Sequence, residues 1–205
     1  KVGGFVELCL NPEMAAEVTL QPVRRVGLDA AIIFSDILIV PHALGVKLWF
    51  EESEGPRLDP VNDAMSFARM QPALDQKIAE PVYEALKLVR AALPTNMTLI
   101  GFCGAPWTVA SYLIAGRGTE DQSPAKALMR GDEKLFASII DRDASAVGRE
   151  TRISVAAGRC GDRFLSAGPI DPDEAARRHT ARGHIGQRTG VADRNRAPTT
   201  EAFDE

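Results

Sequence analysis

Cysteine, aromatic residues and long apolar runs are all scarce in this chain of 205 residues. The three cysteines are odd in number and show no CxxC spacing, which favours a reducing cytoplasm over a disulfide framework: Cys9, Cys103 and Cys160. No apolar run is long enough to cross a bilayer, and the first residues lack the apolar core of a secretory signal. We therefore expect a cytoplasmic protein with no membrane partner.

Signatures of nucleotide, nucleic-acid and metal binding are missing as well. Neither a P-loop nor a GxGxxG motif follows an apolar segment, and the three histidines show no paired spacing. The net charge of −4 and the pI near 5.5 argue against a surface for nucleic acid. The sequence thus predicts no metal site and no nucleic-acid partner.

The most informative segment that is present runs from Asp29 to Pro41. Its apolar residues are almost continuous, as in a strand that is buried on both faces. Asp36 stands where the first apolar run ends, and burial of its charge requires hydrogen-bond donors. Ligands of parallel α/β sheets bind at the carboxyl ends of the strands, so Asp36 is a candidate site residue. The alternative is that Asp36 only caps the helix that follows.

Helix and strand signals alternate up to about residue 140. A helix is expected to begin at Asn11–Pro12 and to end at Gly27. After the strand with Asp36, the order is an extended piece, a helix that Pro81 interrupts, a strand and two further helices: 46–51, 72–93, 98–104, 106–115 and 124–140. This order predicts an α/β protein, either a doubly wound sheet or a (β/α)8 barrel.

The composition changes after residue 140. All six lysines precede this point, whereas eleven arginines and as many acidic residues follow it. No apolar period lasts more than a few residues there, so the segment cannot bury enough surface to offset its ordering entropy. We expect residues 1–140 to form the folded part and residues 141–205 to form a disordered or irregular tail.

Several blocks of this chain resemble the uroporphyrinogen decarboxylase family in order and spacing. They are Asn11-Pro12-Glu13, Thr19-Leu20-Gln21-Pro22, Arg24-Arg25, residues 29–38, Pro41-His42-Ala43-Leu44-Gly45 and residues 101–112. The resemblance covers roughly residues 4–140. It implies a (β/α)8 barrel, usually a homodimer, that acts without a metal or a cofactor. The implied reaction removes the carboxyl groups of four acetate side chains of uroporphyrinogen III and gives coproporphyrinogen III in haem synthesis.

The resemblance also implies three site residues. The central carboxylate of the family corresponds to Asp36, the tyrosine that faces the substrate to Tyr112, and a phenylalanine that lines the pocket to Phe5. Loss of CO₂ leaves electron density on a methylene carbon, and a protonated pyrrole ring takes up those electrons. A fixed anion beside the pyrrole N–H groups stabilises that cationic ring. For Tyr112 the alternative is a helix residue that packs on the barrel.

The resemblance is incomplete, which leads to further expectations. The arginine-rich segment that opens the family, a later Ser or Thr and a C-terminal His have no counterpart, so we expect a barrel that is truncated at both ends and an inactive chain. A change of reading frame near Ile140–Asp141 is the expected cause, because residues 156–161, shifted by one base, permit the family-like Gln-x-Ala-Gly-Ala-Glu. The alternatives are a zinc-dependent cobamide or methylamine methyltransferase of the same superfamily and a non-catalytic protein.

Overall fold

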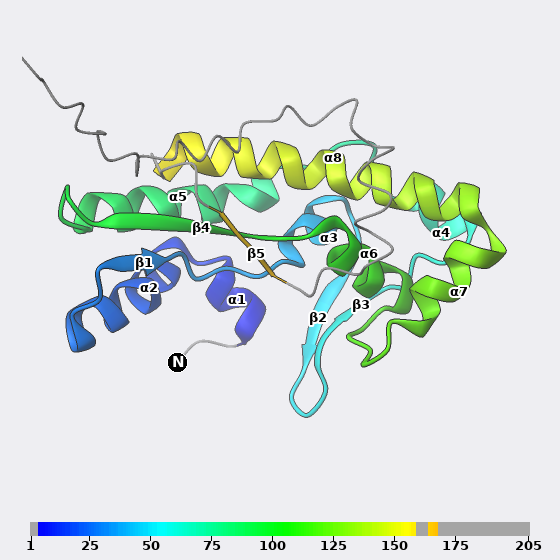
Figure 1. Cartoon of the computed structure of the whole chain (residues 1–205), viewed down its shortest axis with the longest axis horizontal. Coiled ribbons are helices and arrows are strands. Elements are labelled where there is room, and N and C mark those ends of the chain that lie inside the picture. The colour runs from blue at the N-terminus through cyan, green and yellow to red at the C-terminus, as the bar shows by residue number, and fades with distance from the viewer. Residues whose placement is uncertain (1–3, 159–163, 168–205) are drawn as a thin grey trace, which may run out of the picture. The chain divides into compact units, whose positions relative to one another are not determined.

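The computed structural model describes residues 4–158 and 164–167 (Figure 1). The helices are α1 (Phe5–Cys9), α2 (Pro12–Val26), α3 (Ile39–Ala43), α4 (Ala64–Arg69), α5 (Gln76–Ala92), α6 (Pro106–Ala115), α7 (Ser123–Gly131) and α8 (Glu133–Gly158). The strands are β1 (Ala30–Ile32), β2 (Leu48–Glu51), β3 (Gly55–Leu58), β4 (Thr98–Gly104) and β5 (Phe164–Ala167). The predicted α/β class is confirmed by this alternation of helices and strands.

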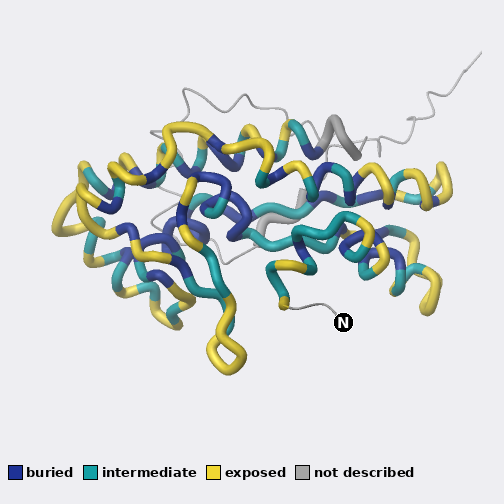
Figure 2. The backbone as a smooth tube through the Cα atoms, turned by 180° about the vertical axis from the view of Figure 1, so that it is seen from behind, coloured by how far each residue is buried: buried dark blue, intermediate teal, exposed yellow. Residues whose placement is uncertain are grey.

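The main sheet is parallel and has the strand order β1-β4-β5. In its register Ala31 lies opposite Leu99, and Gly101 lies opposite Phe164. Long helical connections join the strands, as parallel pairing requires. The antiparallel hairpin of β2 and β3 projects from the helices and carries an exposed tip (Figures 1 and 2).

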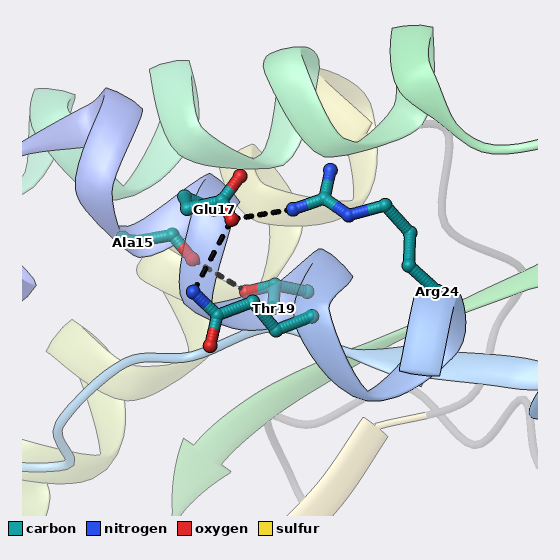
Figure 3. A network of polar contacts seen from close by, with 5 residues as sticks. Ala15, Glu17, Thr19 and Arg24 are labelled. Carbon is teal, nitrogen blue, oxygen red and sulfur yellow. Dashed lines mark hydrogen bonds and ion pairs between the residues drawn. The ribbon is translucent and has the colours of Figure 1, made fainter. Parts of the chain in front are cut away.

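Local sequence signals explain the limits of α2. The Asn11 side chain accepts a hydrogen bond from the backbone N–H of Met14 at 2.9 Å, which caps the first turn. Gly27 ends the helix in the left-handed region with φ 72°. The expected helix is confirmed. Arg24 pairs with Glu17 on the exposed face, which agrees with a role at the end of an outer helix (Figure 3).

One hydroxyl group joins α2 to the segment after β1. Thr19 Oγ1 donates to the carbonyl oxygen of Ala15 at 2.7 Å and accepts a hydrogen bond from the backbone N–H of Phe34 at 2.9 Å (Figure 3 shows the bond to Ala15). Because Phe34 lies two residues before Asp36, this contact fixes the path of the chain into the predicted site.

Two apolar clusters hold the described part together. The first includes Leu44, Val109, Leu113 and Ile139 and lies between α3, α6 and α8. The second lies between α2, α5 and the sheet and includes Leu20, Leu86, Val89 and Leu99. Burial of these side chains is the main favourable contribution to folding. Within the described residues, no helix is both long and apolar enough to span a bilayer.

The structure corrects several expected limits. The strand expected to end at Asp36 is shorter, because β1 ends at Ile32, and the second apolar run leads into α3. The helix expected over 72–93 begins at Gln76, after the Asp75 cap, and includes Pro81 in its interior. The single helix expected over 124–140 is two helices, because Asp132 leaves helical geometry and its side chain accepts from the N–H of Leu135.

The helix α8 also continues past the predicted boundary at residue 140. It runs to Gly158, and its buried positions keep a helical spacing as far as Ser154 (Figure 2). The predicted division of the chain at residue 140 therefore falls inside one helix. The remainder of the predicted tail, apart from residues 141–158 and 164–167, lies outside the described residues.

Candidate functional site

The carboxyl ends of β1 and β4 lie at the same edge of the sheet. The ladder continues one residue past β1, where the N–H of Ile33 donates to the carbonyl oxygen of Ile100 at 3.0 Å. Gly104, at the end of β4, leaves no room for a side chain: a Cβ atom there would overlap Val109 and would lie 3.0 Å from Ile37 Cβ. The segment after β1 and the first turn of α6 therefore meet at Gly104.

Asp36 lies in this segment, half-buried between β1 and α3. Its Oδ1 accepts a hydrogen bond from the backbone N–H of Leu38 at 2.6 Å. Burial raises the pKa of the Asp36 carboxyl group, and the hydrogen bond from Leu38 opposes part of that rise. The cap residue of α3 is Leu38, and no side chain caps its first turn. Asp36 binds the backbone N–H of Leu38, just before α3, and stands at the carboxyl edge of the sheet, so its role in a site stays a prediction.

Phe5 reaches the same region from α1. Its ring contacts Phe34 edge-to-face with centroids 5.8 Å apart, and it contacts Phe50 of β2 at 5.6 Å. On the same helix, burial and, to a lesser extent, the charge of Asp36 raise the pKa of Cys9 to about 12. These contacts bring the aromatic cluster of Phe5, Phe34 and Phe50 next to the segment that carries Asp36.

Tyr112, the third predicted residue, lies elsewhere on the edge. It belongs to α6, and its side chain packs against the first core cluster. Its hydroxyl oxygen lies 3.0 Å from where a Cβ atom of Gly118 would stand, in the loop after α6. The contacts described for Tyr112 are thus with this loop and the core, whereas Phe5 and Asp36 share the region after β1.

Sequence reasoning missed two residues that line a small cavity together with Asp36. This cavity of about 10 Å³ is lined by Asp36, by Cys103 of β4 and by Glu150 of α8. Glu150 is 7 % exposed, and its Oε1 accepts a hydrogen bond from the Ser154 hydroxyl group at 2.6 Å. The spacing of 139, 143, 146, 150 and 154 on one helical face is the signal that identifies Glu150, but it carries acids where an apolar pattern was sought.

Burial affects the protonation of the two further groups that line the cavity, Cys103 and Glu150. Burial raises the pKa of Cys103 and of Glu150, so both favour their neutral forms. Within residues 4–158 and 164–167, no three side chains of His, Cys, Asp or Glu gather as metal ligands would. The arrangement offers the Asp36 carboxylate near an aromatic surface, which suits a ligand that carries aromatic rings and N–H donors.

Comparison with known proteins gives a consistent result. A sequence model of uroporphyrinogen decarboxylase matches residues 1–160. The chain is 51 % identical over 159 residues to a uroporphyrinogen decarboxylase of Jannaschia sp., an alignment that covers 77 % of this chain and 46 % of the relative. A protein of the same name from Sphingopyxis alaskensis is 53 % identical over 141 residues, covering 68 % of this chain and 40 % of the relative.

A solved structure supports the fold. The structure of this chain is similar to that of a methyltransferase from Methanosarcina mazei, with a TM-score of 0.61. The sequence identity is 20 %, and the match covers 83 % of this chain and 51 % of that protein. At this identity the likeness concerns the fold alone. The chain spans about half the length of the curated relatives that it matches.

Proposed function

Because the chain belongs to the uroporphyrinogen decarboxylase family, we propose that it is part of an enzyme that converts uroporphyrinogen III to coproporphyrinogen III by removing four acetate carboxyl groups. The complete enzyme would be a (β/α)8 barrel of which the parallel strands β1, β4 and β5 are consecutive members. The observation that carries the proposal is the half-buried Asp36 carboxylate at the carboxyl edge of β1.

Asp36 would stabilise the cationic intermediate of the reaction. When a proton adds to a pyrrole carbon, the ring becomes positively charged and can take up the electrons of the breaking C–CO₂ bond. Oδ1 is held by the Leu38 N–H, so the carboxylate is oriented before the substrate arrives. A preorganised charge in a dry site costs no reorganisation during the reaction, and one such interaction is worth about 3–4 kcal/mol.

The other two predicted residues would act on the rest of the macrocycle. The rings of Phe5 and Phe34 would pack on a pyrrole ring of the tetrapyrrole, since they form an aromatic surface next to the segment that carries Asp36. The Tyr112 hydroxyl group would donate to a substrate carboxylate from the far side of the edge. The proposal includes a cytoplasmic homodimer and needs neither a metal nor a cofactor, because the Asp36 carboxylate and the pyrrole ring supply the charge and the electron sink.

The methyltransferase alternative receives less support. The Jannaschia relative, which is 51 % identical to this chain over the 159 aligned residues, carries the decarboxylase name, whereas the methyltransferase structure is 20 % identical and indicates the fold only.

A chimera tests the proposal, because this chain alone spans about half of its relatives and is expected to show no turnover. Residues 1–160 would replace the matched segment of the Jannaschia enzyme, and coproporphyrinogen formation would be measured. The chimera should be active, and Asp36→Asn should lower its kcat about 100- to 1,000-fold.

The matched control is Asp29→Asn, an exposed carboxylate at the opposite end of β1, which should leave turnover unchanged. Near-normal turnover of the Asp36→Asn chimera would contradict the role of Asp36. An inactive but folded chimera with the native Asp36 would contradict the proposed activity as a whole.

A further inference from the structure

The loop of residues 116–122, which follows α6, is attached at both of its ends. At its start, the carbonyl oxygen of Gly116 accepts a hydrogen bond from the backbone N–H of Leu58 at 2.8 Å, at the end of β3. At its far end, Oε1 of Gln122 accepts a hydrogen bond from the indole N–H of Trp107 at 2.7 Å. Because these partners belong to β3 and α6, the loop is held against the helix that carries Tyr112.

The backbone of Gln122 shows how firmly the far end of the loop is held. Its φ is 55°, in the left-handed region that residues with a Cβ atom rarely adopt. Among the described residues other than glycine, no second residue has a positive φ. Such a conformation persists only where the surrounding structure enforces it. The hydrogen bond from Trp107 is one of the contacts that enforce it here.

Gly118, in the middle of this loop, faces the Tyr112 ring without room for a side chain. A Cβ atom at residue 118 would lie 3.0 Å from the Tyr112 hydroxyl oxygen, and 3.3 and 3.4 Å from the ring atoms Cζ and Cε1. Carbon atoms attract each other best at about 3.5–4.0 Å, so the two carbon contacts would already be too close. The φ of Gly118 is not in the left-handed region, so its backbone does not require glycine. The space for Tyr112 is what requires it.

We propose that Gly118 is a positioning residue for Tyr112, and that its bare α-carbon, held by the anchored loop, sets where the Tyr112 hydroxyl group stands. The half-buried Tyr112 side chain also packs against the first core cluster, so it is confined by the core and by the loop. A methyl group at residue 118 would displace the hydroxyl group, because the loop is anchored and the ring is the freer partner. The catalytic consequence rests on the proposed function, in which this hydroxyl group donates to a substrate carboxylate.

The contact can be tested without substrate by ¹⁹F NMR of the full chain labelled with 3-fluorotyrosine. The chain has two tyrosines, Tyr83 and Tyr112, so two signals are expected, and that of Tyr112 is identified by its loss in Tyr112→Phe. Gly118→Ala should shift the Tyr112 signal and leave the Tyr83 signal in place. The matched control is Gly131→Ala, where a Cβ atom would meet nothing beyond its own helix within 4 Å, and it should leave both signals unchanged.

Turnover of the chimera with the Jannaschia enzyme tests the consequence for catalysis. Displacement of a binding group by a fraction of an ångström should lower kcat/KM about threefold to tenfold in Gly118→Ala. Tyr112→Phe deletes a hydrogen bond to a charged group and should lower it about 10- to 100-fold. Because Gly118 acts through the hydroxyl group, Gly118→Ala should cost less than about twofold more in the Tyr112→Phe background.

The outcomes distinguish this proposal from the proposed function. An unchanged Tyr112 signal in Gly118→Ala, or an equal loss of kcat/KM with and without the hydroxyl group, would overturn the positioning role. If Gly118→Ala does not fold, the double variant with Tyr112→Phe decides, because it lacks the oxygen that makes the closest contact. A folded double variant, seen by circular dichroism, supports the contact, and an unfolded one refutes it. The NMR result does not depend on turnover, so an inactive chimera leaves it valid.

Discussion

The two halves of α8 bury side chains at the same helical spacing, but the buried side chains are apolar in the first half and include acidic and hydroxyl groups in the second. Between Glu133 and Ile140 the buried side chains are Phe136 and Ile139, and the Phe136 ring contacts Trp107 edge-to-face with centroids 5.8 Å apart. From Asp141 to Ser154 the buried positions include two acids and a hydroxyl group: Asp143, Glu150 and Ser154. Helical periodicity therefore decides which positions are buried, while the sequence decides whether burial helps or harms stability.

Within the polar half, one charged side chain is satisfied by its neighbours and another is not. Arg142 donates to the carbonyl oxygens of Phe67 and Met70 at 3.2 and 3.3 Å, and its guanidinium group lies 3.9 Å from the Phe67 ring centroid. Asp143, by contrast, is 0 % exposed, and neither of its carboxylate oxygens has a hydrogen-bond partner among the described residues. The contrast predicts that replacing the buried acid Asp143 by an apolar side chain changes stability with the opposite sign to truncation of a buried side chain in the apolar half.

The largest effect is expected in the apolar half. Ile139→Ala deletes a fully buried side chain from the first core cluster and should lower the free energy of unfolding by about 2–5 kcal/mol. Urea denaturation followed by circular dichroism measures this loss. A loss below ~1 kcal/mol would mean that α8 is not anchored by its first half.

In the polar half, the expected change has the opposite sign. Asp143→Val replaces a buried carboxyl group that lacks a described partner with an apolar side chain and should raise the free energy of unfolding at pH 7 by about 1–3 kcal/mol. Asp141→Asn, an exchange of an exposed acid two residues earlier, serves as the control and should change it by less than ~0.5 kcal/mol. Destabilisation by Asp143→Val would indicate that the carboxyl group is bound by a partner.

The same acid predicts an unusual dependence on pH. Burial raises the pKa of Asp143 well above its ordinary value, and it raises those of Glu150 and Asp36 too. The folded chain therefore holds protons on these groups that the unfolded chain has lost, so the contribution of these three groups to stability is greatest below pH ~4 and falls as the pH rises through their folded-state pKa values. The slope is at most about 1.4 kcal/mol per pH unit for each proton. Thermal unfolding measured from pH 4 to 8 should become less steeply dependent on pH in Asp143→Val.

The smallest effect is expected at Arg142. Arg142→Met keeps much of the aliphatic contact with Phe67 but removes the cation and both hydrogen bonds, so stability should fall by about 1 kcal/mol. Hydrogen exchange of the α4 amides reports the same loss locally. Unchanged exchange in α4 would show that the second half of α8 does not stabilise its neighbour.

Elements with strong local signals could be predicted from the sequence. The limits of α2 follow from Asn11, Pro12 and Gly27, and the strand expected over 98–104 is β4. The extension of α8 could not be predicted, because its buried positions past residue 140 carry Asp143, Glu150 and Ser154 and give no apolar period. The frame change expected near residue 140 stays a prediction that the nucleotide sequence can test. The family match, however, extends to residue 160.

The sequence predicted candidate site residues one segment at a time, but it could not predict how the segments that surround them come together. The position of Asp36 relative to β1 depends on how far the ladder with β4 extends, and that pairing joins residues far apart in the sequence. The surroundings of Tyr112 depend on the loop at Gly118, whose path no local pattern specifies. Glu150 lines one small cavity with Asp36 because α8 packs against β4, which is a property of the fold rather than of either segment.

The bare α-carbon of Gly104 couples the position of the Asp36 backbone to the orientation of α6. Ile37 follows Asp36 directly and already touches the space that a methyl group at residue 104 would need. One added carbon would therefore displace the Asp36 carboxylate without altering Asp36, Phe5 or Tyr112 themselves, the side chains that we propose contact the substrate. A graded series of bulk at this position would measure how much displacement the chemistry tolerates, in tenths of an ångström.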